Sequence, residues 1–132
     1  MTKNLDQKGL SSIAQNYNLF YIDLWGVVHN GISLYQEAIN VLNQLQKNDK
    51  EYILLTNAPR PSNTVKVFLE KMGLEKNIRN HVFSSGEAAL DYLKNNYSSQ
   101  KFYHIGPPRD FDLFKDFEKN KSKDIDDCDY FL

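Results

Sequence analysis

The segment LFYIDLWGVVHNG, residues 19–31, decides the fold class of this chain. Its first four residues form a short, aromatic-rich apolar run, which is typical of a parallel β-strand buried in a sheet. Asp23 follows the run directly, and Gly26 and Gly31 permit a tight, irregular loop behind it. Because ligands in open α/β sheets bind at the carboxyl ends of the strands, the segment predicts a carboxylate at the mouth of a sheet.

A second apolar run, residues 52–56, predicts another buried strand. It ends in Thr56 and Asn57, and the two prolines behind them exclude both a helix and a central strand. A carboxylate after the first strand can coordinate Mg²⁺ or attack phosphorus, and the hydroxyl and amide after the second can bind a phosphoryl oxygen. Taken alone, each group is equally compatible with a structural turn or a helix cap.

Strands and helices alternate along the rest of the chain. Ser33 and Ser84 each begin a capping-box spacing, Ser62 and Asp110 are candidate N-caps, and Gly73 is a candidate helix end. The alternation predicts an α/β fold with a mostly parallel sheet. Apolar spacing predicts helices over 10–17, 38–45, 62–72, 85–93 and 110–117, and further strands over 81–83 and 101–105.

The composition fits a soluble globular protein and excludes several partners. The 132 residues are 41% hydrophobic and 25% charged, and the formal net charge of −1 argues against a nucleic acid or an anionic membrane as partner. The lone Cys128 forms no internal disulfide, which favours a reducing, cytoplasmic compartment. No signal-peptide pattern is present, and no run approaches the roughly 20 apolar residues of a membrane span.

The last residues predict an unusual chain end. An acidic stretch, residues 124–129, precedes a three-residue apolar run, Tyr130 to Leu132, that looks like the beginning of a strand. We expect either a truncated chain or a split gene. The alternative is a final edge strand that docks onto the sheet.

Two segments together resemble motifs I and II of the haloacid dehalogenase superfamily. Class IIA of that superfamily has the patterns D-x-D-G-V-x-x-x-G and L-L-T-N-N, which are similar to residues 23–31 and 54–57. The longer strings DLWGVVHNG and TNAPRP resemble a class IIA branch of uncharacterised and sugar-phosphatase-like hydrolases. Residues 84–88 resemble the start of the class IIA cap. The resemblance implies a Rossmann-like parallel sheet with flanking helices, residues 1–83 being half of the core and residues 84–132 the beginning of the cap.

The resemblance also implies a reaction. Asp23 would be the nucleophile of a Mg²⁺-dependent phosphatase, forming an aspartyl-phosphate with a small phosphorylated metabolite. The backbone carbonyl of Trp25, together with Asp23, would hold Mg²⁺, and Thr56 and Asn57 would hold the phosphoryl group.

Trp25 departs from the family pattern. It occupies the position of a second aspartate that protonates the leaving group and then activates water, a role worth about 10²- to 10⁴-fold in rate. His29 is the nearest titratable replacement, although we expect a loop histidine in contact with solvent. Trp25 is either a stacking platform for substrate or, as we expect, a filler of core space beside the site.

The family's motif III lysine and motif IV acidic residues are missing from residues 1–132. Mg²⁺ binding is therefore expected to be weak or absent, and Asp126, Asp127 and Asp129 are expected to form a solvated connection. Enzyme status stays open between one half of a split enzyme that needs a second chain and a non-catalytic remnant. Arg60 is a phosphate ligand or a surface residue, and His81 and His104 are expected to be structural.

Overall fold

Three parallel strands form the main sheet of the computed structural model, which describes residue 5 and residues 8–132. Strands β1 (Leu19–Asp23), β2 (Glu51–Thr56) and β3 (Val82–Ser84) lie in the order β1-β2-β3. All neighbours are parallel, and Asp23 lies opposite Leu55 while Thr56 lies opposite Ser84. The predicted α/β fold class with a parallel sheet is confirmed.

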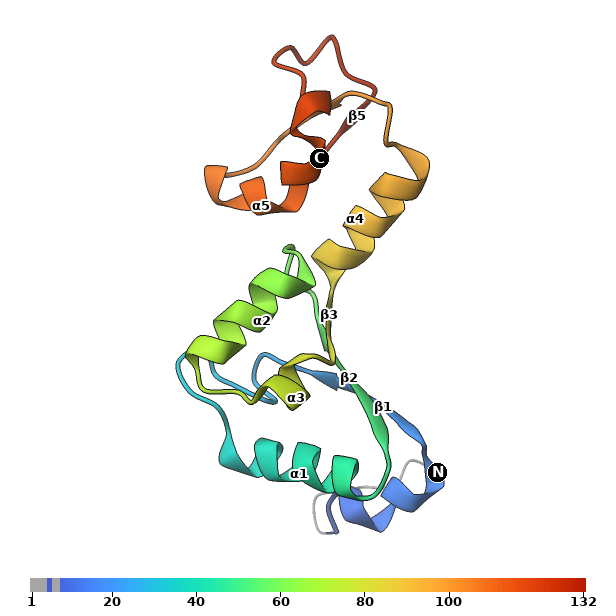
Figure 1. Ribbon diagram of the computed structural model, residues 1–132, viewed down its shortest axis with the longest axis vertical. Helices are drawn as coiled ribbons and strands as arrows, with labels where there is room; N and C mark the ends of the chain where they lie inside the picture. Colours follow the sequence, from blue (N-terminus) through green and yellow to red (C-terminus); the bar gives the residue numbers. More distant parts are fainter. Residues whose placement is uncertain (1–4, 6–7) are drawn as a thin grey trace.

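The helices α1 (Gln36–Lys47), α2 (Ser62–Lys71) and α3 (Lys76–Arg79) lie on one side of this sheet (Figure 1). Their apolar residues pack on the inward-facing residues of β2 and β3, which gives one continuous core. The short helix α3 was not expected from the sequence. The buried core residues are Leu24, Val28, Leu42, Leu45, Tyr52, Leu54, Val65, Leu69, Leu74, Ile78 and Val82.

The opposite face of the sheet is exposed. Side chains alternate along a strand, so the outward residues of the three strands gather on this face. Tyr21 is 65% exposed there, and Leu55 and Phe83 are exposed beside it. The prediction of a fully buried first strand is therefore wrong, because helices of the described chain cover only one side of it.

Several predicted helix starts are also wrong. Helix α1 begins after Tyr35 and has no side-chain cap, while Asn30 Oδ1 accepts the amides of Ile32 and Ser33. Helix α2 has Pro61 as its N-cap, and Ser62 is its first residue. The helix expected over 10–17 is two 3₁₀ turns, Leu10–Ser12 and Ala14–Asn16. Gly73, with φ of 88°, does follow the end of α2 as predicted.

A second, smaller lobe begins with helix α4 (Ser85–Asn96), which leads away from the main sheet (Figure 1). Strands β4 (Phe102–Tyr103) and β5 (Tyr130–Phe131) pair in parallel, so the last apolar run docks as an edge strand on a separate two-stranded sheet. The strand expected over 101–105 is only two residues long. The lobe also contains α5 (Phe111–Phe114) and two 3₁₀ helices, Pro108–Asp110 and Lys115–Asn120. The buried residues of its hydrophobic cluster are Leu90, Leu93, Phe102, Phe114 and Phe117. Asp110 precedes α5 but makes no side-chain cap.

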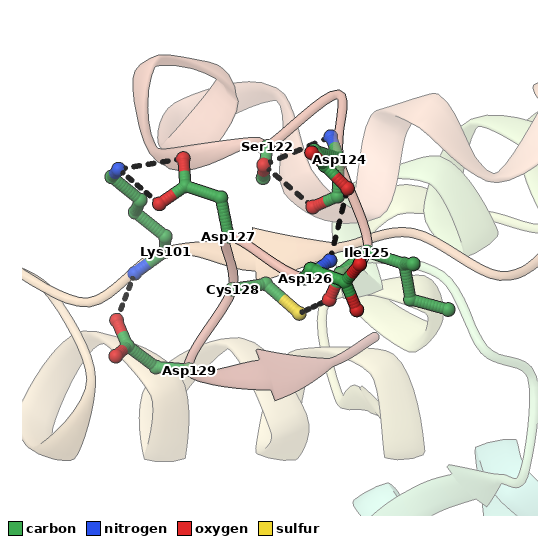
Figure 2. A network of polar contacts seen from close by, with 8 residues as sticks. All are labelled: Lys101, Ser122, Asp124, Ile125, Asp126, Asp127, Cys128 and Asp129. Atoms are coloured by element: carbon green, nitrogen blue, oxygen red, sulfur yellow. Dashed lines mark hydrogen bonds and ion pairs between the residues drawn. The ribbon is translucent and has the colours of Figure 1, made fainter.

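The acidic segment 124–129 is folded against the start of β4 (Figure 2). Lys101 Nζ donates to both carboxylate oxygens of Asp127 at 2.8 Å, and the Lys101 amide donates to Asp129 at 2.7 Å. The hydrogen bond that Lys101 donates to Asp127, together with the negative charge of Asp127, raises the pKa of Lys101. Asp127 and Asp129 therefore bind within their own lobe while remaining exposed to solvent.

Two kinds of feature are absent from the described residues. They contain no cluster of three or more His, Cys, Asp or Glu side chains that could hold a metal ion. No helix in the same part of the chain is long and apolar enough to cross a membrane.

Candidate functional site

Asp23 and Thr56 lie at the carboxyl ends of two paired strands. Asp23 is opposite Leu55, the residue before Thr56, and neighbouring strands in a sheet are about 4.8 Å apart. The two predicted site residues therefore share one edge of the sheet. Strand alternation places Asp23 with Tyr21 on the open side and Thr56 with Leu54 on the helix-covered side.

Asp23 is exposed, and one of its two carboxylate oxygens accepts a hydrogen bond. Its Oδ1 accepts the amide of Leu24 at 2.7 Å. Within residues 8–132, its Oδ2 accepts no hydrogen bond. This oxygen is thus available to a ligand or to a reacting phosphorus atom.

The loop behind Asp23 is tightly anchored at Leu24. The Leu24 carbonyl accepts the amides of Val27, Val28 and His29 at 3.3, 2.8 and 3.1 Å, and the Leu24 and Val28 side chains are buried. Gly26, with φ of 75°, donates to the His29 carbonyl at 2.8 Å. No backbone amide of the described residues donates to the carbonyl of Trp25.

His29 is buried, with 4% of its surface exposed, so the expectation of a solvent-contacting loop histidine is wrong. Its Nδ1 accepts the amide of Gly31 at 3.0 Å, which leaves the proton of the neutral ring on Nε2. The ring lies edge-on between Trp25 and Phe68, with centroid separations of 5.6 and 5.7 Å. Burial lowers the pKa of His29, and the negative charge of Asp23 opposes that effect.

The Trp25 side chain is 66% exposed, so the expectation that it fills core space is also wrong. Its indole lies against Gly31, where an added Cβ would come within 2.5 Å of the ring. Gly31 has φ of 90°, a conformation that a residue with a side chain rarely adopts. The indole can therefore occupy this position only because residue 31 is a glycine.

Thr56 and Asn57 begin a turn that is fixed from the second lobe. Thr56 Oγ1 accepts the amide of Ala58 at 3.2 Å, and Asn57 is exposed. The Ala58 carbonyl accepts the Gly86 amide at 3.1 Å and the Ser85 hydroxyl at 3.0 Å. The turn is thus held by the first residues of α4.

Ser84 and Glu87 form half of the predicted capping box. The Glu87 amide donates to Ser84 Oγ at 3.2 Å, as predicted. The Glu87 carboxylate, however, accepts the amide of Ser62 at 2.8 Å instead of that of Ser84, because the Ser84 amide donates to Ser62 Oγ. Ser84 Oγ also donates to the Arg60 carbonyl. Sequence spacing predicts the local bond, and no sequence signal predicts the bonds to residues 58–62.

Asp112 was not predicted as part of this region. Its Oδ2 accepts the Thr64 hydroxyl at 3.0 Å and lies 3.9 Å from Arg60 Nη1. Arg60 therefore faces a carboxylate of the second lobe. His81 packs its ring on Tyr52, and His104 donates from Nδ1 to the Leu132 carbonyl at 3.0 Å, so both have structural contacts as expected.

The family model for haloacid dehalogenase-like hydrolases matches residues 20–119. The chain belongs to this family. The resemblance to class IIA of the haloacid dehalogenase superfamily, carried by residues 23–31 and 54–57, is thereby confirmed. No curated protein matches the chain.

Similar solved structures are about twice as long as this chain or longer. A haloacid dehalogenase-like hydrolase from Brucella suis is 25% identical, with a TM-score of 0.78 over 92% of this chain and 44% of that one. A 4-nitrophenylphosphatase from Thermotoga maritima is 19% identical, with a TM-score of 0.69 over 90% and 45%. A glycerol phosphate phosphatase from Mycobacterium tuberculosis in complex with magnesium is 21% identical, with a TM-score of 0.63 over 87% and 35%. The chain thus spans less than half the length of each of these proteins.

Proposed function

We propose that this chain carries the nucleophile half of a Mg²⁺-dependent phosphohydrolase site for a small phosphorylated metabolite. The observation that carries the proposal is the placement of Asp23 and Thr56 at adjacent ends of paired parallel strands in a chain of this family. The phosphatases among the similar structures support the reaction type.

In the proposed reaction, Asp23 attacks the phosphorus atom and forms an aspartyl-phosphate while the bond to the leaving oxygen breaks. Water then cleaves the aspartyl-phosphate and restores the carboxylate. Thr56 and Asn57 hold the phosphoryl oxygens through their hydroxyl and amide groups. The loop anchored at Leu24 keeps Asp23 in position at the sheet edge.

Two oxygen ligands for Mg²⁺ fit this site: Asp23 Oδ2 and the Trp25 carbonyl. Bound Mg²⁺ would screen the repulsion between the carboxylate and the phosphate. Mg²⁺ requires near-octahedral oxygen coordination, and the described residues contain no group of three or more His, Cys, Asp or Glu side chains that could hold a metal ion. We therefore expect weak Mg²⁺ binding by this chain alone.

Trp25 supplies no proton, and His29 is buried with its Nδ1 already bonded to Gly31. Among the described residues, neither of these two side chains next to Asp23 therefore supplies the general acid and base that such a reaction uses. Little or no turnover by the isolated chain is expected.

A second polypeptide would complete the site under this proposal. It could cover the exposed face around Tyr21, Leu55 and Phe83 and the outer edge of β1, which pairs with no other strand of the described residues. We assign residues 1–83 to the core half and residues 84–132 to the beginning of the cap. A non-catalytic remnant that binds phosphate without Mg²⁺ is the alternative.

The phosphate subsite is tested by titrating the labelled chain with inorganic phosphate and following its backbone amides by NMR, with and without Mg²⁺. Saturable shifts are expected in residues 23–31 and 56–58. Thr56→Ala should weaken binding by about tenfold, since a hydrogen bond to a charged group contributes roughly 1.5 kcal/mol.

Thr64→Ala is the matched control, because the Thr64 hydroxyl bonds to Asp112 and not to the candidate site. It should leave phosphate affinity unchanged. Shifts that are scattered over the surface, or equal affinity in the Thr56 variant, would contradict the subsite. Saturable binding that is the same without Mg²⁺ would favour the non-catalytic alternative.

A further inference from the structure

Trp25 is an exposed aromatic side chain two residues after the candidate nucleophile. It is the single tryptophan of the chain, and two thirds of its surface is open to solvent. Most aromatic side chains of this size bury a large apolar area, so an exposed one beside a reactive carboxylate requires a reason. Val27 and Ile32 of the same loop are exposed as well, so the loop presents further apolar surface to solvent.

The indole is held in place although it is exposed. Gly31 leaves room for the ring on one side, because any Cβ there would overlap it. The His29 ring meets it edge-on at 5.6 Å, and His29 is itself fixed by Phe68 and by the Gly31 amide. A pre-positioned aromatic face loses little conformational entropy when a ligand stacks on it.

The same contacts place the indole close to the reactive carboxylate. His29 touches Trp25, and the charge of Asp23 acts on the His29 ring, so the three side chains form one neighbourhood. A ring bonded to a phosphate at Asp23 would therefore lie within reach of the indole.

We propose that Trp25 is a stacking platform for a planar aromatic ring of a phosphate monoester. This inference rests on the proposed function, because it assumes that the phosphoryl group lies at Asp23 and Thr56. An aromatic ring suits this loop better than a sugar, since its exposed side chains Val27 and Ile32 are apolar and Asn30 Oδ1 and the Ser33 hydroxyl bond to each other within the loop.

The test compares phenyl phosphate with methyl phosphate, which share the phosphate monoester and differ in the ring. Dissociation constants are measured by calorimetry on the full chain with Mg²⁺, and the lone tryptophan gives an independent fluorescence readout. Phenyl phosphate should bind about 2- to 12-fold more tightly. Trp25→Ala should abolish the difference, and Trp25→Phe should retain most of it. Both substitutions keep the backbone carbonyl proposed for Mg²⁺.

Tyr92→Ala is the control, because Tyr92 is an exposed aromatic residue on α4, in the other lobe. It should preserve the preference for phenyl phosphate. Equal affinity for the two esters in the wild-type chain, or a preference that survives Trp25→Ala, would overturn the platform. A preference for glucose 6-phosphate over phenyl phosphate would overturn the aromatic assignment.

Binding of phenol and of inorganic phosphate distinguishes a failure of the Trp25 platform from a failure of the proposed phosphate site. If methyl phosphate and inorganic phosphate bind but the ring adds nothing, the platform is wrong and the phosphate site stands. If phenol binds as tightly as phenyl phosphate and inorganic phosphate does not compete, the phosphate site is wrong although Trp25 binds rings. If none of these probes binds, both are wrong.

Discussion

Gly86, the second residue of helix α4, lies against the turn that follows Thr56, and the position of that turn depends on this one residue. A Cβ at this position would overlap the backbone of Arg60, while the Gly86 amide donates to the Ala58 carbonyl. The small residue lets two backbones approach, and the turn after Thr56 is fixed by that approach.

Gly86→Ala should therefore push α4 away from the turn. Overpacking at a close backbone contact costs about 1–3 kcal/mol, so the free energy of unfolding measured in urea should fall by that amount. Phosphate affinity at Thr56 should fall with it. Asn95→Ala, on the exposed surface of the same helix, should leave both quantities nearly unchanged; a comparable loss there, or none in Gly86→Ala, would contradict this account.

Single residues differ in how well the sequence predicts them. The strand-end positions of Asp23 and Thr56 follow from the apolar runs before them and are confirmed. The burial of His29 and the exposure of Trp25 are opposite to expectation. They depend on Phe68, which lies far along the chain, and on the space at Gly31, and neither can be inferred from local sequence.

At the scale of elements, Tyr52 connects β2 to α1. Its side chain is 1% exposed, and its hydroxyl accepts Gln46 Nε2 at 2.9 Å. Burial raises the pKa of Tyr52 from 10.0 to about 12. The unfolded chain therefore releases this proton at a lower pH than the folded chain does.

This pKa shift predicts a loss of stability at alkaline pH. Below pH 10 the contribution of Tyr52 is complete, and it is lost as the pH rises from about 10 to about 12, by at most about 2–3 kcal/mol. Urea unfolding curves at about pH 9 and about pH 11.5 measure this loss. Tyr52→Phe should show a smaller fall than the wild-type chain, whereas identical falls would show that Tyr52 does not titrate differently in the two states.

Helices and strands are predicted better than their caps. Apolar spacing locates α1, α2 and α4, because packing on the sheet selects those faces. The caps at Ser33 and Ser62 were wrong because both residues bond to partners that helix spacing does not specify, Asn30 and Ser84. The open face of β1 was missed since an apolar run does not reveal whether one side or both sides are covered.

At the scale of the whole molecule, the described residues form two hydrophobic clusters joined through α4 and leave one face of the main sheet exposed. The similar structures are about twice as long as this chain or longer. Under the proposed function, Asp23 and Thr56 are one half of a phosphoryl-transfer site, and the described residues supply neither the proton donor nor the further metal ligands. The family motifs predict this division, whereas composition does not.

The most direct test is the hydrolysis of p-nitrophenyl phosphate by the 132-residue chain with Mg²⁺. The wild-type chain is compared with Asp23→Asn and with Asp91→Asn, which removes an exposed carboxylate on α4 far along the chain. The half-site account predicts that all three proteins release p-nitrophenol at the same rate as buffer alone. Turnover by the wild-type chain and by Asp91→Asn that is lost in Asp23→Asn would contradict it.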